Sequence, residues 1–197
     1  MERGDSKIMK ILEQRIIEDG IIINNDILKV DSFINHQIDV ALVRDLAKEI
    51  NNEFKDLGVN KILTIETSGI AFAYAVAEEM GDLPLVFAKK SKSATVGSDV
   101  YTAQVKSFTR NTVSPITVSN KYIKPSDTVL IVDDFLAEGN AAFGLLDICN
   151  QAGAKVVGAA VAIEKSFQGG RARLEAKGLK VYSGANIKAF EDNKPVF

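Results

Sequence analysis

The sequence has very few of the residues on which several classes of catalytic and metal site depend. Cys149 is its only cysteine, which excludes an intrachain disulfide and leaves no cysteine cluster for a metal. His36 is its only histidine, and no Gly-x-Ser-x-Gly motif accompanies it. A serine nucleophile activated by histidine is therefore not indicated, and we interpret His36 and Cys149 as structural residues.

Long apolar runs and a large excess of one charge are also missing. No segment approaches the ~20 apolar residues that a helix needs to cross a bilayer. Residues 1–20 are typical of a polar tail and an amphipathic helix rather than a signal peptide. The formal net charge is −2, so no basic field favours nucleic acid. We expect a cytoplasmic protein that binds neither a membrane nor nucleic acid.

The hydrophobic pattern alternates between helix and strand periods. Helices are expected at 8–19, 40–57, 70–80, 138–151 and 168–177, and strands at 61–65, 83–88, 128–132, 155–163 and 179–182. Residues 100–108 and 114–118 predict a strand or hairpin, and the residues after 182 predict a polar tail. This order predicts an α/β fold, a parallel sheet with helices on both faces. A length of 197 residues suits one domain.

Polar side chains follow four of the predicted strands. These groups are Glu66–Gly69, Lys89-Lys90, Asp133–Asn140 and Glu164-Lys165. In parallel sheets, ligands bind outside the carboxyl ends of the strands. We therefore expect the four groups to gather at one edge of the sheet and to form the functional site.

The stretch "VLIVDDFLAEGN" (129–140) is the most specific of these signals. Two carboxylates ~4–5 Å apart repel each other by roughly 3–4 kcal/mol at an effective dielectric of ~20, so Asp133 and Asp134 should bind something. The following loop contains Gly139 and leads into a helix N-terminus, where free N–H groups bind anions. The carboxylates would bind hydroxyls or a metal ion, and the loop beside them would bind a phosphate. A ligand with both kinds of group is a sugar phosphate. The alternative is that the two acids cap the helix or pair with surface lysines.

Two further groups point to a second phosphorylated position on the ligand. Ser68 and Gly69 precede another helix N-terminus, and Lys89 and Lys90 follow a strand at the same edge. A diphosphate would be neutralised there. The alternatives are an ordinary N-cap and solvated surface lysines.

Five stretches of this sequence resemble a known family. They are "ILKVDSFINHQID", "ILTIETSGIA", "VFAKKSKS", "VLIVDDFLAEGNAAFGLL" and "AIEKSFQGGR", and they run in order from about residue 27 to 173. Together they resemble the type I phosphoribosyltransferases, most closely the bacterial xanthine phosphoribosyltransferases. The resemblance implies a type I core, a small hood built from about residues 1–40 and 164–197, a flexible loop at about 89–104, and a homodimer.

The resemblance also implies roles for the site residues. Asp133 and Asp134 would hold the ribose hydroxyls of phosphoribosyl pyrophosphate (PRPP), and Lys90 would act with them in catalysis as the loop closes. The remaining PRPP contacts would come from Ala137, Glu138, Gly139, Asn140, Ala141, Ser68, Gly69 and Lys89. Mg²⁺ would be held mainly through PRPP and pyrophosphate, without a metal site formed by the protein alone. Ala141 lacks the hydroxyl that many family loops offer, and Glu138 adds a negative charge beside the phosphate.

A second set of residues indicates which base accepts the phosphoribosyl group. An ammonium donates hydrogen bonds and accepts none, so Lys165 suits the O6 carbonyl of xanthine, guanine or hypoxanthine and not the amino group of adenine. Phe167 would stack on the base or belong to the core. The resemblance places Leu28 and Asn35 over the base. The implied reaction converts xanthine and PRPP into xanthosine monophosphate and pyrophosphate.

Two other functions remain open at this point. Asn35 alone does not separate xanthine from guanine, because an amide offers both a donor and an acceptor, so a guanine/hypoxanthine phosphoribosyltransferase is one alternative. The other is a non-catalytic, PRPP-sensing purine regulator, which would need a DNA-reading module that this chain lacks. A dinucleotide-binding Rossmann protein is disfavoured because no Gly-x-Gly-x-x-Gly motif follows any strand.

Overall fold

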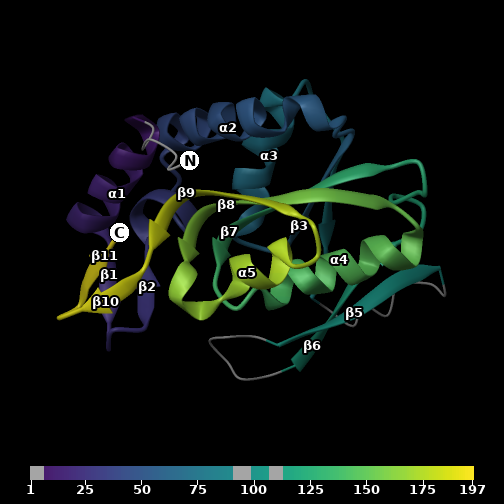
Figure 1. Cartoon of the computed structure of the whole chain (residues 1–197). Coiled ribbons are helices and arrows are strands. Elements are labelled where there is room, and N and C mark those ends of the chain that lie inside the picture. Colours follow the sequence, from purple (N-terminus) through teal and green to yellow (C-terminus); the bar gives the residue numbers. More distant parts are fainter. Residues whose placement is uncertain (1–6, 91–98, 107–112) are drawn as a thin grey trace.

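A five-stranded parallel sheet forms the centre of the protein (Figure 1). The computed structural model describes residues 7–90, 99–106 and 113–197. In spatial order the strands are β4 (Leu85–Ala88), β3 (Lys61–Ile65), β7 (Thr128–Leu136), β8 (Lys155–Lys165) and β9 (Lys180–Ile187). Every neighbouring pair is parallel. The predicted α/β fold is confirmed.

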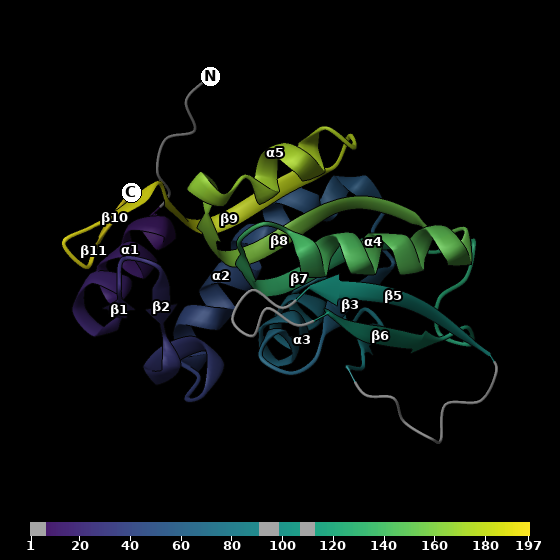
Figure 2. The same cartoon turned by 90° about the horizontal axis from the view of Figure 1, so that it is seen from below.

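Helices cover both faces of this sheet, as predicted (Figures 1 and 2). One face carries α2 (Val40–Phe54) and α3 (Gly69–Glu79), with α1 (Lys7–Asp19) beside α2, and the other carries α4 (Asn140–Ala152) and α5 (Gly170–Glu175). The antiparallel hairpin of β5 (Val100–Lys106) and β6 (Val113–Ser119) packs on α4. The core is accordingly divided into two apolar clusters, one on each face. None of the described helices is long and apolar enough to span a membrane.

Helix α2 shows how the local sequence sets these elements. Asp39 caps its first turn, because its carboxylate accepts a hydrogen bond of 3.1 Å from the N–H of Leu42. Leu46, Ile50 and Phe54 recur at helical spacing and are fully buried. The chain then makes one 3₁₀ turn, Lys55–Leu57, and stops at Gly58, whose φ of 69° suits glycine. The helix predicted at 40–57 is confirmed.

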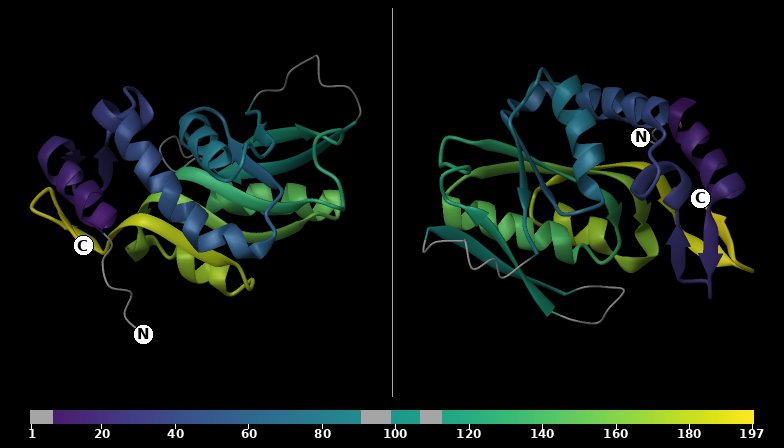
Figure 3. Two further views of the ribbon diagram at one scale, coloured as in Figure 1. Left: turned by 90° about the horizontal axis from the view of Figure 1, so that it is seen from above. Right: turned by 180° about the vertical axis from the view of Figure 1, so that it is seen from behind.

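Both ends of the described chain build a small hood at one end of the sheet (Figure 3). It contains the hairpin β1 (Ile21–Ile23) and β2 (Ile27–Lys29), a π-helical turn at Asp31–Asn35, and the hairpin β10 (Ala189–Glu191) and β11 (Lys194–Val196). Asn25 and Asn193 join the two hairpin turns, since each side-chain oxygen accepts the other's backbone N–H, at 3.0 and 2.6 Å. The prediction of a polar tail after residue 182 was wrong.

Several predicted boundaries also need correction. Strand β7 does not end at residue 132 but continues through Asp133 and Asp134 to Leu136, and β8 and β9 continue to Lys165 and Ile187. Polar side chains suggest a strand end, but backbone pairing with a neighbouring strand does not depend on side-chain polarity. Asp133, for example, pairs with Val161 of β8.

The predicted bounds of the hood and of the loop at 89–104 also need correction. Because β8 and β9 run in the central sheet, the hood does not include 164–187, and its second part begins with β10. The loop predicted at 89–104 is shorter, because Lys89 pairs with Thr117 and residues 100–104 lie in β5. Residues 91–98 of that loop lie outside the described residues. Helix α4 starts at Asn140 rather than 138, and α5 covers only part of 168–177.

The strand order reverses between β3 and β7. From β3 the chain moves outward to β4 on one side, and from β7 it moves through β8 to β9 on the other. The loops that leave β3 and β7 therefore diverge and open a crevice above the sheet. A ligand site is therefore expected in the crevice between these two loops rather than along the whole carboxyl edge of the sheet.

Replacing Leu46 should test the core between α2 and β9. A Cβ atom at Gly184 of β9 would lie 2.7 Å from Cδ2 of Leu46, which shows how closely the two elements pack. Leu46→Ala should lower the free energy of unfolding by about 2–5 kcal/mol, because it leaves a cavity in a fully buried position. Leu57→Ala, at a side chain that is 39% exposed, is the matched control and should cost less than about 1 kcal/mol. Equal losses in urea unfolding would contradict this description of the core.

Candidate active site

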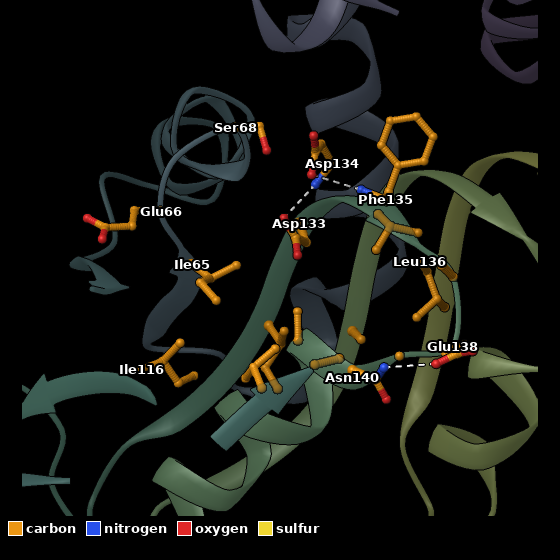
Figure 4. Close-up of a pocket in the computed structure, with 18 of the residues that line it drawn as sticks. Ile65, Glu66, Ser68, Ile116, Asp133, Asp134, Phe135, Leu136, Glu138 and Asn140 are labelled. Carbon is orange, nitrogen blue, oxygen red and sulfur yellow. Dashed lines mark hydrogen bonds between the residues drawn. The ribbon is translucent and has the colours of Figure 1, made fainter. Parts of the chain in front are cut away.

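A cavity of about 590 Å³ lies at the reversal of strand order (Figure 4). It is lined by the end of β3 and the residues that follow it, by Lys90, by β7 with the loop and helix start up to Ala142, and by residues of the β5–β6 hairpin and of β8. The predicted site residues that line it are Ser68, Lys90, Asp133, Asp134, Ala137, Glu138, Gly139, Asn140 and Ala141. The structure therefore brings together the acids, one lysine, the serine and the whole predicted phosphate loop.

The two aspartates form the acidic part of this cavity. The Asp133 carboxylate accepts a hydrogen bond of 2.9 Å from the N–H of Asp134, whose own carboxylate accepts one of 3.1 Å from Phe135. Burial and the neighbouring Asp134 charge raise the pKa of Asp133 well above its usual value, and the Lys90 ammonium offsets this only in part. The predicted repulsion is thus present, and this part of the cavity favours cations and hydrogen-bond donors.

The loop after β7 turns its carbonyl groups away from the cavity. The Ala137 carbonyl accepts a hydrogen bond of 3.1 Å from the N–H of Gly170, the Glu138 carbonyl accepts one from Arg173, and the Gly139 carbonyl accepts one of 2.9 Å from Phe143. No hydrogen-bond acceptor within the described ranges is assigned to the backbone N–H groups of 138–141. Those groups and the N-terminus of α4 form an anion cradle.

The side chain of Glu138 does not lie free in this cradle. Asn140 donates a hydrogen bond of 2.9 Å from its side-chain nitrogen to the Glu138 carboxylate (Figure 4). The carboxylate therefore has a local partner. The negative charge that the sequence places in the loop is held by this pair.

Gly69 lies beside the acids rather than on the cavity wall. A Cβ atom at this position would lie 2.6 Å from Asp133 Oδ1 and 2.6 Å from Thr64 Oγ1, so only glycine fits. The Thr64 hydroxyl is fully buried and has no hydrogen-bond partner within the described ranges. Gly69 thus allows the start of α3 to approach the carboxylate of Asp133.

The two neighbouring lysines have different environments. The backbone of Lys89 exchanges hydrogen bonds of 3.0 and 2.9 Å with Thr117, which fixes β6 beside β4, and Lys89 is not among the lining residues. Lys90 lines the cavity, and its backbone N–H donates to the carboxylate of Glu66. Of these two lysines, Lys90 is therefore the one placed to act on the contents of the cavity, which Lys106 of β5 lines as well.

The four residues predicted for the base do not share one pocket. Asn35 approaches the acids, with its amide nitrogen 3.4 Å from Asp134 Oδ2. Lys165 and Phe167 lie against the hood: the Lys165 ammonium donates a 2.6 Å hydrogen bond to the Asp26 carbonyl, and Phe167 packs on Phe190 with ring centres 5.6 Å apart. Burial lowers the pKa of Lys165. Leu28, 7% exposed, belongs to the core.

Sequence reasoning did not select several of the lining residues, among them Glu66, Thr67 and Phe135. Glu66 and Thr67 follow β3, and Phe135 directly follows the two aspartates. Phe135 lies beside Asp134 (Figure 4). Glu66 lay within a polar group noted at the strand end and could have been selected for its charge. Phe135 gave no signal, because it looks like one more apolar strand residue.

Metal binding by protein ligands alone is not indicated in the part of the chain that the structure describes. There, no three side chains of His, Cys, Asp or Glu lie close enough to hold an ion. The carboxylates that line the cavity are those of Glu66, Asp133, Asp134 and Glu138. They are hard ligands of the kind that Mg²⁺ accepts beside substrate oxygens.

Comparison with known proteins gives close relatives over nearly the full chain. The sequence profile of the phosphoribosyl transferase domain matches residues 29–193. Xanthine phosphoribosyltransferases of Streptococcus agalactiae and Clostridium tetani are each 49% identical over 189 residues, which is 96% of this chain and 97% and 100% of those proteins.

Solved structures show the same fold at lower identity. The adenine phosphoribosyltransferase of Trypanosoma brucei superposes with a TM-score of 0.79 at 16% identity, covering 98% of this chain and 85% of that one. The Giardia lamblia adenine phosphoribosyltransferase gives 0.66 at 25% identity, over 74% and 80% of the two chains. With the profile match and the extended identity to the two bacterial relatives, these findings show that the chain belongs to the phosphoribosyl transferase family.

Proposed function

We propose that this protein transfers the 5-phosphoribosyl group of PRPP to xanthine and releases xanthosine monophosphate and pyrophosphate. The observation that carries the proposal is the cavity in which Asp133 and Asp134 adjoin an anion cradle at the reversal of strand order. Carboxylates for ribose hydroxyls and N–H groups for a phosphate fit the two ends of phosphoribose. The names of the bacterial relatives, 49% identical, support xanthine as the acceptor.

Each part of the cavity has a role in the proposed reaction. Asp133 and Asp134 accept hydrogen bonds from the ribose hydroxyls and lie near the cationic sugar that forms as the bond to pyrophosphate breaks. The amides of 138–141 bind the 5-phosphate, and Ser68 and Lys90 bind the leaving pyrophosphate. The enzyme thus works mainly by orienting the reactants and stabilising charge. Lys89 and Gly69 support this arrangement through the backbone and through close packing.

We propose Mg²⁺ as the cofactor, held mainly by the oxygens of PRPP. Burial and the neighbouring Asp134 charge raise the pKa of Asp133, which fits a site that receives a cation, and oxygen atoms provide the donor set. Bound there, Mg²⁺ supplies positive charge to the leaving diphosphate. The chain contributes carboxylates that orient the sugar and a lysine that shares the neutralisation.

Base recognition is proposed for the residues between the acids and the hood. Asn35 lies against Asp134, so a base joined to the ribose would come within reach of its amide, whose Oδ1 is buried without a partner in the described part of the chain. Lys165, at the end of β8, presents an ammonium group that donates hydrogen bonds, one of them to the Asp26 carbonyl. Phe167 adds an aromatic face, and Leu28 supports the hood from the core.

Replacing either aspartate should remove most of the activity. Asp133→Asn or Asp134→Asn should lower kcat/KM for PRPP by about 10- to 100-fold or more, because charged hydrogen bonds to the ribose are lost. Pyrophosphate release with xanthine and Mg²⁺ measures this. Asp147→Asn is the matched control, since Asp147 lies exposed on α4 outside the cavity lining. Full activity in both site variants would refute the proposed sugar site.

Asp133→Asn should at the same time stabilise the free protein. The raised pKa means that the folded state disfavours the ionised carboxylate relative to the unfolded chain, so stability falls as pH rises from the unfolded value of about 3.9 to the raised one. The asparagine of the variant does not ionise, so the variant does not lose stability in this way as pH rises. Its advantage in melting temperature should therefore be absent at acidic pH and full above the raised pKa. A variant that is less stable at every pH would contradict the electrostatic argument.

Competition between purines tests the base assignment. Xanthine should react faster than guanine, hypoxanthine and adenine, and Asn35→Ala should lower kcat/KM for xanthine about tenfold or more while changing that for hypoxanthine less, since hypoxanthine has only hydrogen at position 2. Equal turnover of guanine would keep the enzyme class but refute the discrimination proposed for Asn35, and faster turnover of guanine and hypoxanthine would make the protein a guanine/hypoxanthine enzyme. Binding of PRPP without reaction of any base would favour the non-catalytic regulator.

A homodimer in the cytoplasm completes the proposal. Helix α1 supports the dimer with apolar side chains that the fold leaves outside, since Ile11 and Ile17 are 43% and 56% exposed. Light scattering should give twice the mass of 21.4 kDa. The mass of a single chain at micromolar concentration would contradict it.

A further inference from the structure

Arg173 of α5 holds the phosphate loop from outside the cavity. Its guanidinium donates a hydrogen bond to the Glu138 carbonyl and lies over the Phe143 ring of α4, 4.5 Å from its centre. It does not line the cavity. One side chain thus joins α5, the loop and the first turn of α4.

Arg173 acts beside a second contact from the same element. Gly170 donates its N–H to the Ala137 carbonyl, and a Cβ atom at Gly170 would lie 2.3 Å from that oxygen. Two successive carbonyls of the loop are therefore turned toward α5. Since a peptide unit points its N–H opposite to its C=O, holding these carbonyls outward directs the N–H groups of 138 and 139 toward the cavity.

The charge of Arg173 has a local counterpart. Glu138 places a carboxylate in a loop that must receive an anion, and its partner Asn140 is neutral. The guanidinium on the Glu138 carbonyl is the cation next to this residue. A positive charge at this position would offset the negative charge of Glu138, which opposes a phosphate in the cradle.

We propose that Arg173 is a positioning residue for the 5-phosphate subsite, which fixes the loop amides and compensates Glu138 without touching the ligand. The proposal rests on the proposed function for the identity of the phosphate. It predicts two results that would not be expected if Arg173 only stabilised the fold. Loss of Arg173 must weaken phosphate binding more than it weakens the fold, and the loss must depend on Glu138.

Ribose 5-phosphate binding, measured by calorimetry at low salt, provides the main test. Arg173→Met should weaken binding about three- to tenfold and raise KM for PRPP by a similar factor, with kcat and KM for xanthine nearly unchanged. Lys177→Met is the matched control, because it removes the same charge from an exposed position shortly after α5. Binding by Arg173→Met equal to that of Lys177→Met would overturn the proposal.

A double-mutant cycle with Glu138→Gln tests the compensation. In that background, Arg173→Met should weaken ribose 5-phosphate binding less, because there is no carboxylate left to offset. Arg173→Lys should restore part of the binding, since it keeps the charge and a donor but lacks the planar group that lies on Phe143. An Arg173→Met effect of the same size with and without Glu138 would refute the charge argument. Should Arg173→Met fail to fold, the Arg173→Lys and Glu138→Gln variants provide the same comparison.

The proposed function and the proposed role of Arg173 can be refuted independently of each other. If the wild-type protein binds ribose 5-phosphate but transfers the phosphoribosyl group of PRPP to no base, the proposed function is wrong, while weaker ribose 5-phosphate binding in Arg173→Met still supports the role of Arg173. If xanthine is converted and Arg173→Met has the wild-type KM for PRPP, only the role of Arg173 is refuted.

Discussion

The repulsion between two adjacent carboxylates at the end of the central strand is the constraint on which the site depends. Both aspartates lie within strand β7, where Asp133 and Phe135 on either side of Asp134 pair with β8, so they cannot move apart as loop residues would. The fold holds a partly buried charge that it disfavours, and that cost raises the pKa of Asp133. Such a cost is typical of functional sites, where binding of the ligand relieves what folding imposes.

The surroundings of the acids are shaped by close backbone approach. Gly69 brings α3 against Asp133, and Gly170 brings α5 against the loop after β7. Helix α5 itself is anchored by Arg171, which pairs with the fully buried Glu164 of β8 and donates a 2.9 Å hydrogen bond to the Val181 carbonyl of β9. A buried ion pair of this kind adds little net stability, but removing one partner is costly. It fixes the element that carries Gly170 and Arg173.

The hood connects this sheet edge to both ends of the chain. Asn35 reaches Asp134 from the N-terminal part, and Lys165 at the end of β8 donates to the turn between β1 and β2. The hood therefore contacts both Asp134 and Lys165 directly. A change in the position of the hood would alter both groups at once.

The sequence by itself determined the alternation of helices and strands, the parallel sheet, and the group of acids, glycine loop and lysines at one sheet edge. It did so because hydrophobic period and glycine placement are local properties of the chain. Tertiary structure decided where the strands end, since the partners of β7 and β9 continue the pairing beyond the polar residues that suggested a stop. It also separated Lys89 from Lys90, turned the C-terminal segment into a hairpin, and brought Arg173 to Glu138. These outcomes depend on contacts between residues far apart in sequence, and no local pattern contains them.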